Sequence, residues 1–172
     1  MRDHLLDEWV DAGGGTSSFF AAEADAFLDF LGQRLPADSH TNTICRLEQA
    51  TLRASEGARQ FVVPYARRLD GEHSVIRTGP FASLVRFLAE PRLLIRALNG
   101  DGPLPPVGSA SIFMLFAPGL KGWCRMASGP ETALWKCAAA TQRVSDLLAQ
   151  GHRSETVAEL VRAGALEITK AV

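Results

Sequence analysis

Several side chains that carry out chemistry in proteins fall close together in residues 40–48. The sequence HTNTICRLE holds a histidine, a cysteine, an arginine and a carboxylate. A cysteine beside a histidine is the pair found in thiol nucleophiles, and both residues bind metal ions. The segment continues with helical periodicity, so His40 and Cys45, five residues apart, point about 140° away from one another. We therefore expect neither a Cys–His nucleophile nor a metal site within this segment alone.

The polar residues of this helix lead to a different hypothesis. Its apolar face consists of Ile44, Leu47, Thr51, Ala54 and Ala58. Arg46, Gln49 and Arg53 recur on the opposite face, and Glu48 lies at the border between the two. The pattern fits a solvated face, or a stripe that docks on a partner, because arginine donates paired hydrogen bonds to carboxylates. If Glu48 is partly buried, it needs a fixed partner.

The second candidate site is a β-hairpin. Two apolar runs in SIFMLFAPGLKGWCRMAS are joined around Pro118, Gly119 and Gly122, which predicts a hairpin. Trp123 and Arg125 alternate along its second strand. Either Trp123 packs in the core with Arg125 at its rim, or the two residues form a binding surface. An exposed strand edge here would accept a peptide by β-addition.

The composition narrows the possible functions. The chain has 172 residues, 47% of them hydrophobic, and a net charge of -1. It therefore has no global field to attract nucleic acid or an anionic membrane. Three cysteines without a CxxC motif predict neither a disulfide framework nor a zinc module. No apolar run reaches the ~20 residues of a membrane helix, and the first residues do not resemble a signal peptide. We expect a cytoplasmic protein without its own metal ion.

The elements that position these candidates predict an α+β fold. We expect helices over about 3–12, over 18–35 with an N-cap at Thr16 or Ser17, and from residue 40 to an end or kink at Pro64. Strands over 73–78 and 81–87, a helix over 90–99 and the hairpin follow. A capping box of Ser128 and Glu131 predicts a helix through Gln150, followed by a helix over 153–163 and a strand over 165–169. The chain thus divides into a helical region, 1–68, and a winged-helix-like module, 69–172.

A resemblance to a known family sharpens this outline. CRLEQA, SLVRFLAEPRLLIRALNG, PLPP, FMLFAPGLKGWCRMAS and ETALW, in this order, resemble the partner proteins of multinuclear non-haem iron-dependent oxidative enzymes. Such pairs modify cysteines of ribosomally made peptides, for example in the methanobactin and 3-thiaglutamate pathways. The likeness covers about residues 40–137. Each motif is short, and their order and spacing carry the resemblance.

The resemblance implies a non-catalytic subunit of a heterodimer. In that family the iron ions and the chemistry belong to the other subunit, a TIM-barrel-like enzyme. The partner protein binds the leader of the precursor peptide through a module similar to a RiPP recognition element, and it presents the cysteine to the iron site. Region 1–68, with Arg46, Glu48, Gln49 and Arg53, would then face the enzyme. Module 69–172 would hold the leader, and its hairpin residues Pro118, Gly119, Trp123 and Arg125 would bind peptide or enzyme.

Within the family, the 3-thiaglutamate branch fits best, in which a carbon is lost from a peptide-terminal cysteine. Other cysteine-modifying branches stay open.

Two other classes of protein also stay open. A winged-helix DNA-binding regulator would need a basic recognition helix, but SETVAELVRAG has one arginine, Arg162, beside Glu155 and Glu159. A stand-alone enzyme using Cys45 or Cys124 would need a base, and no base lies at a defined spacing from either cysteine.

Overall fold

The computed structural model describes residues 2–14, 20–64, 74–108 and 111–170, and it confirms the α+β class. The chain forms two compact units. The first contains residues 1–52 and 85–112, and the second contains 53–84 and 113–172. This division differs from the expected boundary at 68, because residues 85–112 return to the N-terminal helices. The N-cap predicted at Thr16 or Ser17 lies outside the described residues.

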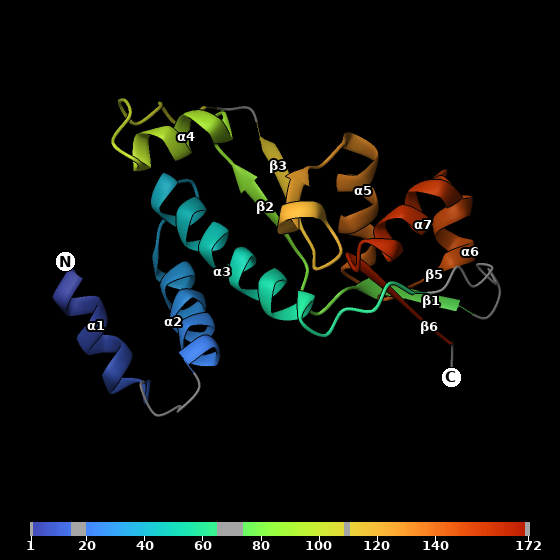
Figure 1. Cartoon of the computed structure of the whole chain (residues 1–172), viewed down its shortest axis with the longest axis horizontal. Helices are drawn as coiled ribbons and strands as arrows, with labels where there is room; N and C mark the ends of the chain where they lie inside the picture. Colours follow the sequence, from blue (N-terminus) through green and yellow to red (C-terminus); the bar gives the residue numbers. More distant parts are fainter. Residues whose placement is uncertain (1, 15–19, 65–73, 109–110, 171–172) are drawn as a thin grey trace. The chain divides into compact units, whose positions relative to one another are not determined.

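The first unit begins with helices that lie beside one another (Figure 1). They are α1 (Arg2–Asp11), α2 (Phe20–Arg34) and most of α3 (His40–Ala58). Trp9 of α1 meets Phe27 and Phe30 of α2 edge to face, with ring centroids 5.5 and 5.3 Å apart. The Arg34 guanidinium covers the Phe30 ring at 3.5 Å. The apolar side of α2 is therefore core, as its periodicity predicts.

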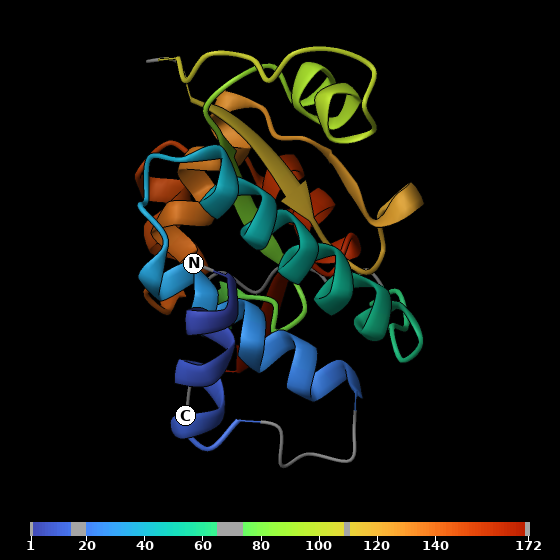
Figure 2. The same cartoon turned by 90° about the vertical axis from the view of Figure 1, so that its left-hand side faces the viewer.

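The first unit also contains α4 (Pro91–Leu98), which has the predicted ends. Pro91 fits the first turn, where its missing N–H is not needed. Gly100 follows the helix with a φ of 84°, a left-handed conformation that glycine adopts without strain. Figure 2 shows α4 at the end of this unit that lies away from α1.

The second unit places helices against a small antiparallel sheet. The strand order is β5-β1-β6, from β5 (Gln142–Arg143), β1 (Ser74–Thr78) and β6 (Leu166–Lys170). Ile76 pairs with Ile168 across β1 and β6. Helices α5 (Gly129–Ala138), α6 (Val144–Ala149) and α7 (Ser154–Arg162) supply most of the other apolar side chains of the core. Its fully buried members include Ile76, Leu115, Leu134, Leu147, Val157 and Leu160.

The predicted hairpin is confirmed. A second sheet has the order β2-β3-β4, from β2 (Ser83–Phe87), β3 (Ile112–Phe116) and β4 (Cys124–Met126). Strands β3 and β4 pair antiparallel, with Met114 opposite Met126 and Phe116 opposite Cys124. A short 3-10 turn (Lys121–Trp123) joins them, and Gly122 has a φ of 68° within it.

Two helix ends differ from the prediction. The helix that starts at the Ser128 capping box ends at Ala138 rather than near Gln150, because residues 142–143 leave it to pair with β1 as β5. No glycine or proline between 138 and 144 signals this stop. Helix α3 ends at Ala58, before Pro64, in a turn where the Gln60 N–H donates to the Gly57 carbonyl at 3.0 Å.

Candidate functional site

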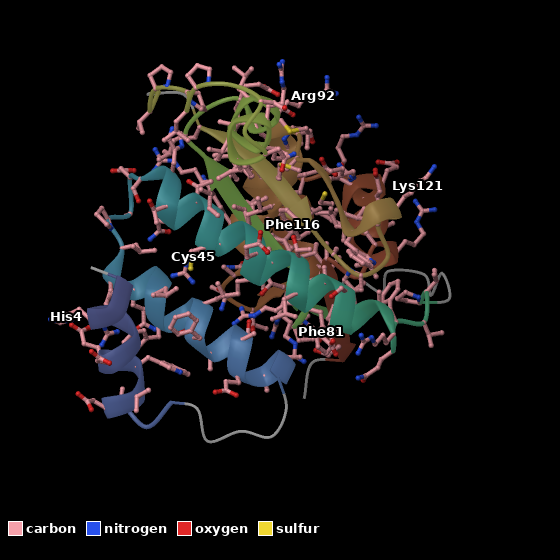
Figure 3. All side chains as sticks on the ribbon, turned by 60° about the vertical axis from the view of Figure 1, so that its left-hand side comes forward. His4, Cys45, Phe81, Arg92, Phe116 and Lys121 are labelled. Carbon is pink, nitrogen blue, oxygen red and sulfur yellow. The ribbon has the colours of Figure 1, made fainter. Side chains whose placement is uncertain are left out.

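His40 and Cys45 make separate contacts within the first unit. His40 is 7% exposed, and its Nε2 donates to the Pro105 carbonyl at 2.7 Å. The Cys45 thiol donates to the Leu28 carbonyl at 3.0 Å, and Figure 3 shows this residue on the side of α3 that faces α2. Burial raises the pKa of the Cys45 thiol, which disfavours the reactive thiolate. The histidine fixes a loop and the cysteine packs between helices, so the segment is not a nucleophile pair.

Arg46 and Gln49, predicted to form part of a docking stripe, turn toward α2. The Arg46 Nη1 donates to Asp29 at 3.2 Å and to the Gln49 side-chain oxygen at 3.1 Å. Gln49 is 4% exposed, and its amide donates to the Asp25 carbonyl at 3.2 Å. Gln49 is therefore not part of an exposed stripe. Its side-chain amide is buried and forms hydrogen bonds with other groups of this chain rather than with water.

Helix α2 approaches α3 closely where the Arg46 guanidinium lies against Gly32. A Cβ built on Gly32 would lie 2.6 Å from the Arg46 Cζ, so a larger residue there would displace the guanidinium. Burial alone would raise the pKa of Asp29, but hydrogen bonds from Arg46 and Gln33 outweigh it, and the net pKa is lowered. We name Asp29, Arg46 and Gln49 the α2–α3 cluster.

The other two residues of the predicted stripe lie on α3 in different surroundings. Glu48 is exposed, so it needs no fixed partner in this chain. Arg53 is half-buried and lies where the chain passes from the first unit to the second. The four polar residues of the predicted stripe thus do not share one open surface.

Arg125 on the hairpin joins three elements of the second unit. Its Nη1 donates to Glu131 at 2.8 Å, its Nη2 also bonds Glu131, and Nη2 donates to Glu159 at 3.0 Å. Glu131 is buried on α5, where it accepts from both the N–H and the hydroxyl of Ser128 at 2.8 Å. We name these four residues the hairpin cluster.

The electrostatics of the hairpin cluster are those of a fixed ion pair. The hydrogen bonds from Arg125, against a smaller opposing effect of burial, lower the pKa of Glu131 to about 2. The same contacts raise the pKa of Arg125. Both groups are therefore charged at neutral pH, and neither exchanges protons as a general acid or base would. Arg125 ties β4 to α5 and α7.

Pro118 and Gly119 also have structural roles. Pro118 is buried, and the Gly119 N–H donates to the Ala163 carbonyl at 2.9 Å. A Cβ on Gly119 would lie 2.5 Å from the Phe61 ring, so the turn approaches its neighbours too closely for a side chain. These two predicted residues position the hairpin against the end of α7.

Trp123 differs from the other hairpin residues. Its side chain is 41% exposed, and its backbone has a φ of 65°. A bulky residue in the left-handed region is uncommon and costs about 1–2 kcal/mol. Met126, at the other end of β4, is 50% exposed. Because β4 is the outer strand in the order β2-β3-β4, apolar side chains stand exposed beside a strand edge.

The sequence did not identify the acidic partners of the two arginines. One signal was present: Asp25, Asp29 and Gln33 form a polar stripe on α2 that complements Arg46 and Gln49 on α3. Glu131 was predicted as a helix cap, but nothing in the spacing points from Arg125 to it. Within the described ranges, no group of three or more His, Cys, Asp or Glu residues is arranged to hold a metal ion.

No described helix is both long and apolar enough to cross a membrane. Comparisons of the chain with protein-family models, with curated proteins and with solved structures found no match.

Proposed function

We propose that this chain is the non-catalytic subunit of a heterodimeric, iron-dependent enzyme that modifies peptides. It binds the leader of a ribosomal precursor peptide and presents the cysteine of that peptide to the iron site of a TIM-barrel-like partner. The motif order in residues 40–137 supports the family, and the loss of a carbon from the cysteine, as in 3-thiaglutamate biosynthesis, is the favoured reaction. A cytoplasmic location accompanies the proposal.

The observation that supports peptide binding best is the exposed Trp123 beside the edge of β4. A strained, solvent-facing tryptophan on a turn is unfavourable for folding and is typical of a binding site. An extended peptide that pairs with a strand edge gains backbone hydrogen bonds, and adjacent apolar side chains provide specificity. Trp123 and Met126 are placed to provide that contact.

The DNA-binding alternative has less support. Helix α7 exposes Glu155 and Glu159, and Glu159 is already paired with Arg125. Negative side chains on a recognition helix repel the phosphate backbone. The stand-alone enzyme is also disfavoured, because burial raises the pKa values of both Cys45 and Cys124.

Co-purification tests the proposed complex. The chain is co-expressed with a multinuclear iron enzyme of the family that its motifs resemble, chosen from the genes that neighbour its own, and the iron content of each separated subunit is measured. We expect a stable heterodimer with iron in the enzyme subunit. Iron held stoichiometrically by this chain alone, or modification of the peptide by this chain alone, would refute the proposal.

A peptide titration tests the hairpin. Trp123→Ala should weaken binding of the leader peptide from the same gene cluster by about tenfold or more, because a central aromatic anchor contributes on the order of 2 kcal/mol. The matched control is Leu148→Ala, which removes another exposed apolar side chain of the second unit, 38% exposed. Equal affinities of the two variants and the parent chain would show that Trp123 does not bind the leader.

A further inference from the structure

Helix α4 and the loop after it expose a cluster of apolar side chains on the first unit. Ile95 and Leu98 share the apolar side of α4 with buried Pro91 and Leu94, yet they are 40% and 49% exposed. In the following loop, Leu104 and Val107 are 58% and 53% exposed. Figures 1 and 2 show this loop running alongside α4. Exposed apolar side chains thus occur both on the helix and on the loop beside it.

Two hydrogen bonds fix the loop that carries Leu104 and Val107. The Pro105 carbonyl accepts from His40, and the Gly108 N–H donates to the Leu88 carbonyl, each at 2.7 Å. Pro103, Pro105 and Pro106 further restrict the backbone. The two apolar side chains are thus held outward by a constrained loop, which lowers the entropic cost of covering them with a partner.

Two arginines flank the apolar side chains. Arg92 and Arg96, at i and i+4, lie next to Ile95 on the wheel of α4, and Figure 3 shows Arg92 projecting from the helix. Arg96 reaches only the Asp101 backbone carbonyl, at 3.4 Å. Within the described part of the chain, neither arginine forms an ion pair, in contrast to Arg46 and Arg125. Among the described residues, therefore, the guanidinium groups of this flank are available to a carboxylate of a partner.

We infer that Arg92, Ile95, Arg96, Leu98, Leu104 and Val107, the α4 surface, dock on an apolar patch of the iron enzyme that is rimmed by carboxylates. This inference rests on the proposed function, and it moves the expected docking surface from α3 to α4. Apolar residues of the α4 surface supply the contact area, and the arginines pair with carboxylates at its edge.

A second copy of this chain fits the α4 surface less well. In a two-fold dimer through antiparallel α4 helices, the same flank of each helix meets its own copy, because such an interface is isologous. Arg92 and Arg96 would then face the arginines of the other copy, and like charges repel. A helix also has no free backbone edge that would pair with an extended peptide. A folded partner with acidic side chains is the occupant that the charges favour.

Affinity for the purified iron enzyme from the same gene cluster tests the inference. Two variants are compared with the parent chain by calorimetry: Arg92→Glu with Arg96→Glu, and Leu98→Ser with Leu104→Ser. We expect each pair to weaken the complex at least about 30-fold, and the charge reversal to invert the salt dependence, because salt screens the new repulsion between like charges. The matched controls are Arg143→Glu with Arg153→Glu, and Leu148→Ser, all at exposed positions of the second unit. These controls should bind like the parent chain.

The outcomes separate the inference from the proposed function. If the parent chain binds the enzyme and the α4 variants bind equally well, the inference is wrong and the proposed function stands. If the parent chain does not bind the enzyme, both are wrong. Light scattering of the chain alone gives the third outcome: a dimer that Leu98→Ser with Leu104→Ser dissociates would assign the α4 surface to a second copy. Circular dichroism of each variant confirms that it is folded.

Discussion

Arg46 in the first unit and Arg125 in the second were both expected to face a partner, and both bond carboxylates of this chain. The two ion pairs differ in how deeply the carboxylate is buried. The side chains of Arg46 and Asp29 are 37% and 45% exposed, whereas Glu131 under Arg125 is 7% exposed. Asp29 sits on one neighbouring helix, while the hairpin cluster joins a strand to two helices. We therefore expect the burial of the carboxylate, rather than that of the arginine, to set how much stability is lost when each cluster is broken.

The largest expected effect is the loss of the Glu131 side chain. Glu131→Ala removes the bonds of the carboxylate to Arg125 and to Ser128, while Arg125 keeps Glu159 and the Met126 carbonyl as partners and the Ser128 hydroxyl still caps the backbone N–H of residue 131. We expect the free energy of unfolding to fall by about 3 kcal/mol, because the hydrogen bonds of a buried carboxylate to Arg125 and Ser128 are lost together. Urea denaturation measures it. Glu155→Ala, on an exposed position of α7, should change stability by less than about 0.5 kcal/mol. Equal effects of the two variants would contradict the buried role of Glu131.

The next largest difference between the two clusters should be the stability that each loses at low pH. The pKa of Glu131 falls from 4.5 to about 2 on folding, so its stabilisation is complete above pH 4.5 and disappears as the pH falls from 4.5 to 2. At most about 3 kcal/mol is lost across this window. The stabilisation from Asp29 is lost in the same direction, because its pKa is also lowered, but screening makes it smaller. Glu131→Gln should flatten the acid branch of stability against pH. An unchanged acid branch in that variant would place the titrating group elsewhere.

The α2–α3 cluster should respond less to mutation. Gln49→Ala leaves the Asp25 carbonyl and Arg46 without their bonds to the amide, at a cost of about 1–2 kcal/mol. The control is Gln33→Ala, which removes the same side chain from an exposed position bonded to the same Asp29. Thermal denaturation of both variants provides the test. A loss from Gln49→Ala as large as that from Glu131→Ala would erase the difference between the two clusters.

Trp123 should contribute little to folding although it is large. Trp123→Gly removes exposed apolar area but also relieves a backbone that glycine adopts freely, so we expect a stability change within about 1 kcal/mol. A tryptophan in a packed core would lose about 3–5 kcal/mol on truncation. Urea denaturation distinguishes the two cases. A loss in the core range would return Trp123 to a structural role.

The smallest effect on stability is expected at the α4 surface. Arg92→Ala with Arg96→Ala removes no ion pair formed within the described part of the chain. The free energy of unfolding should therefore change by less than about 0.5 kcal/mol. The same pair of substitutions should weaken the complex with the iron enzyme. A loss of stability comparable to that of Gln49→Ala would show that these arginines support the fold instead.

The sequence predicted elements well where local signals are strong. The periodicity of α2, the capping box of α5, the glycine after α4 and the hairpin turns are local, and the structure confirms them. The early end of α5 follows from pairing of residues 142–143 with β1, almost seventy residues away in the chain, so no local rule signals it. The burial of Gln49 could not be predicted for the same reason: a helical wheel gives the polar face of α3 but not the helix that covers it.

We propose that the α4 surface and the hairpin turn bind partners, while Arg46 and Gln49 stabilise the fold. Hydrogen–deuterium exchange of the chain, free and bound to the iron enzyme from its gene cluster, tests this directly. We predict that binding slows exchange in peptides covering 91–108 and leaves those covering 42–52 unchanged. Slowed exchange along 42–52 with no change over 91–108 would contradict the claim and restore α3 as the docking helix.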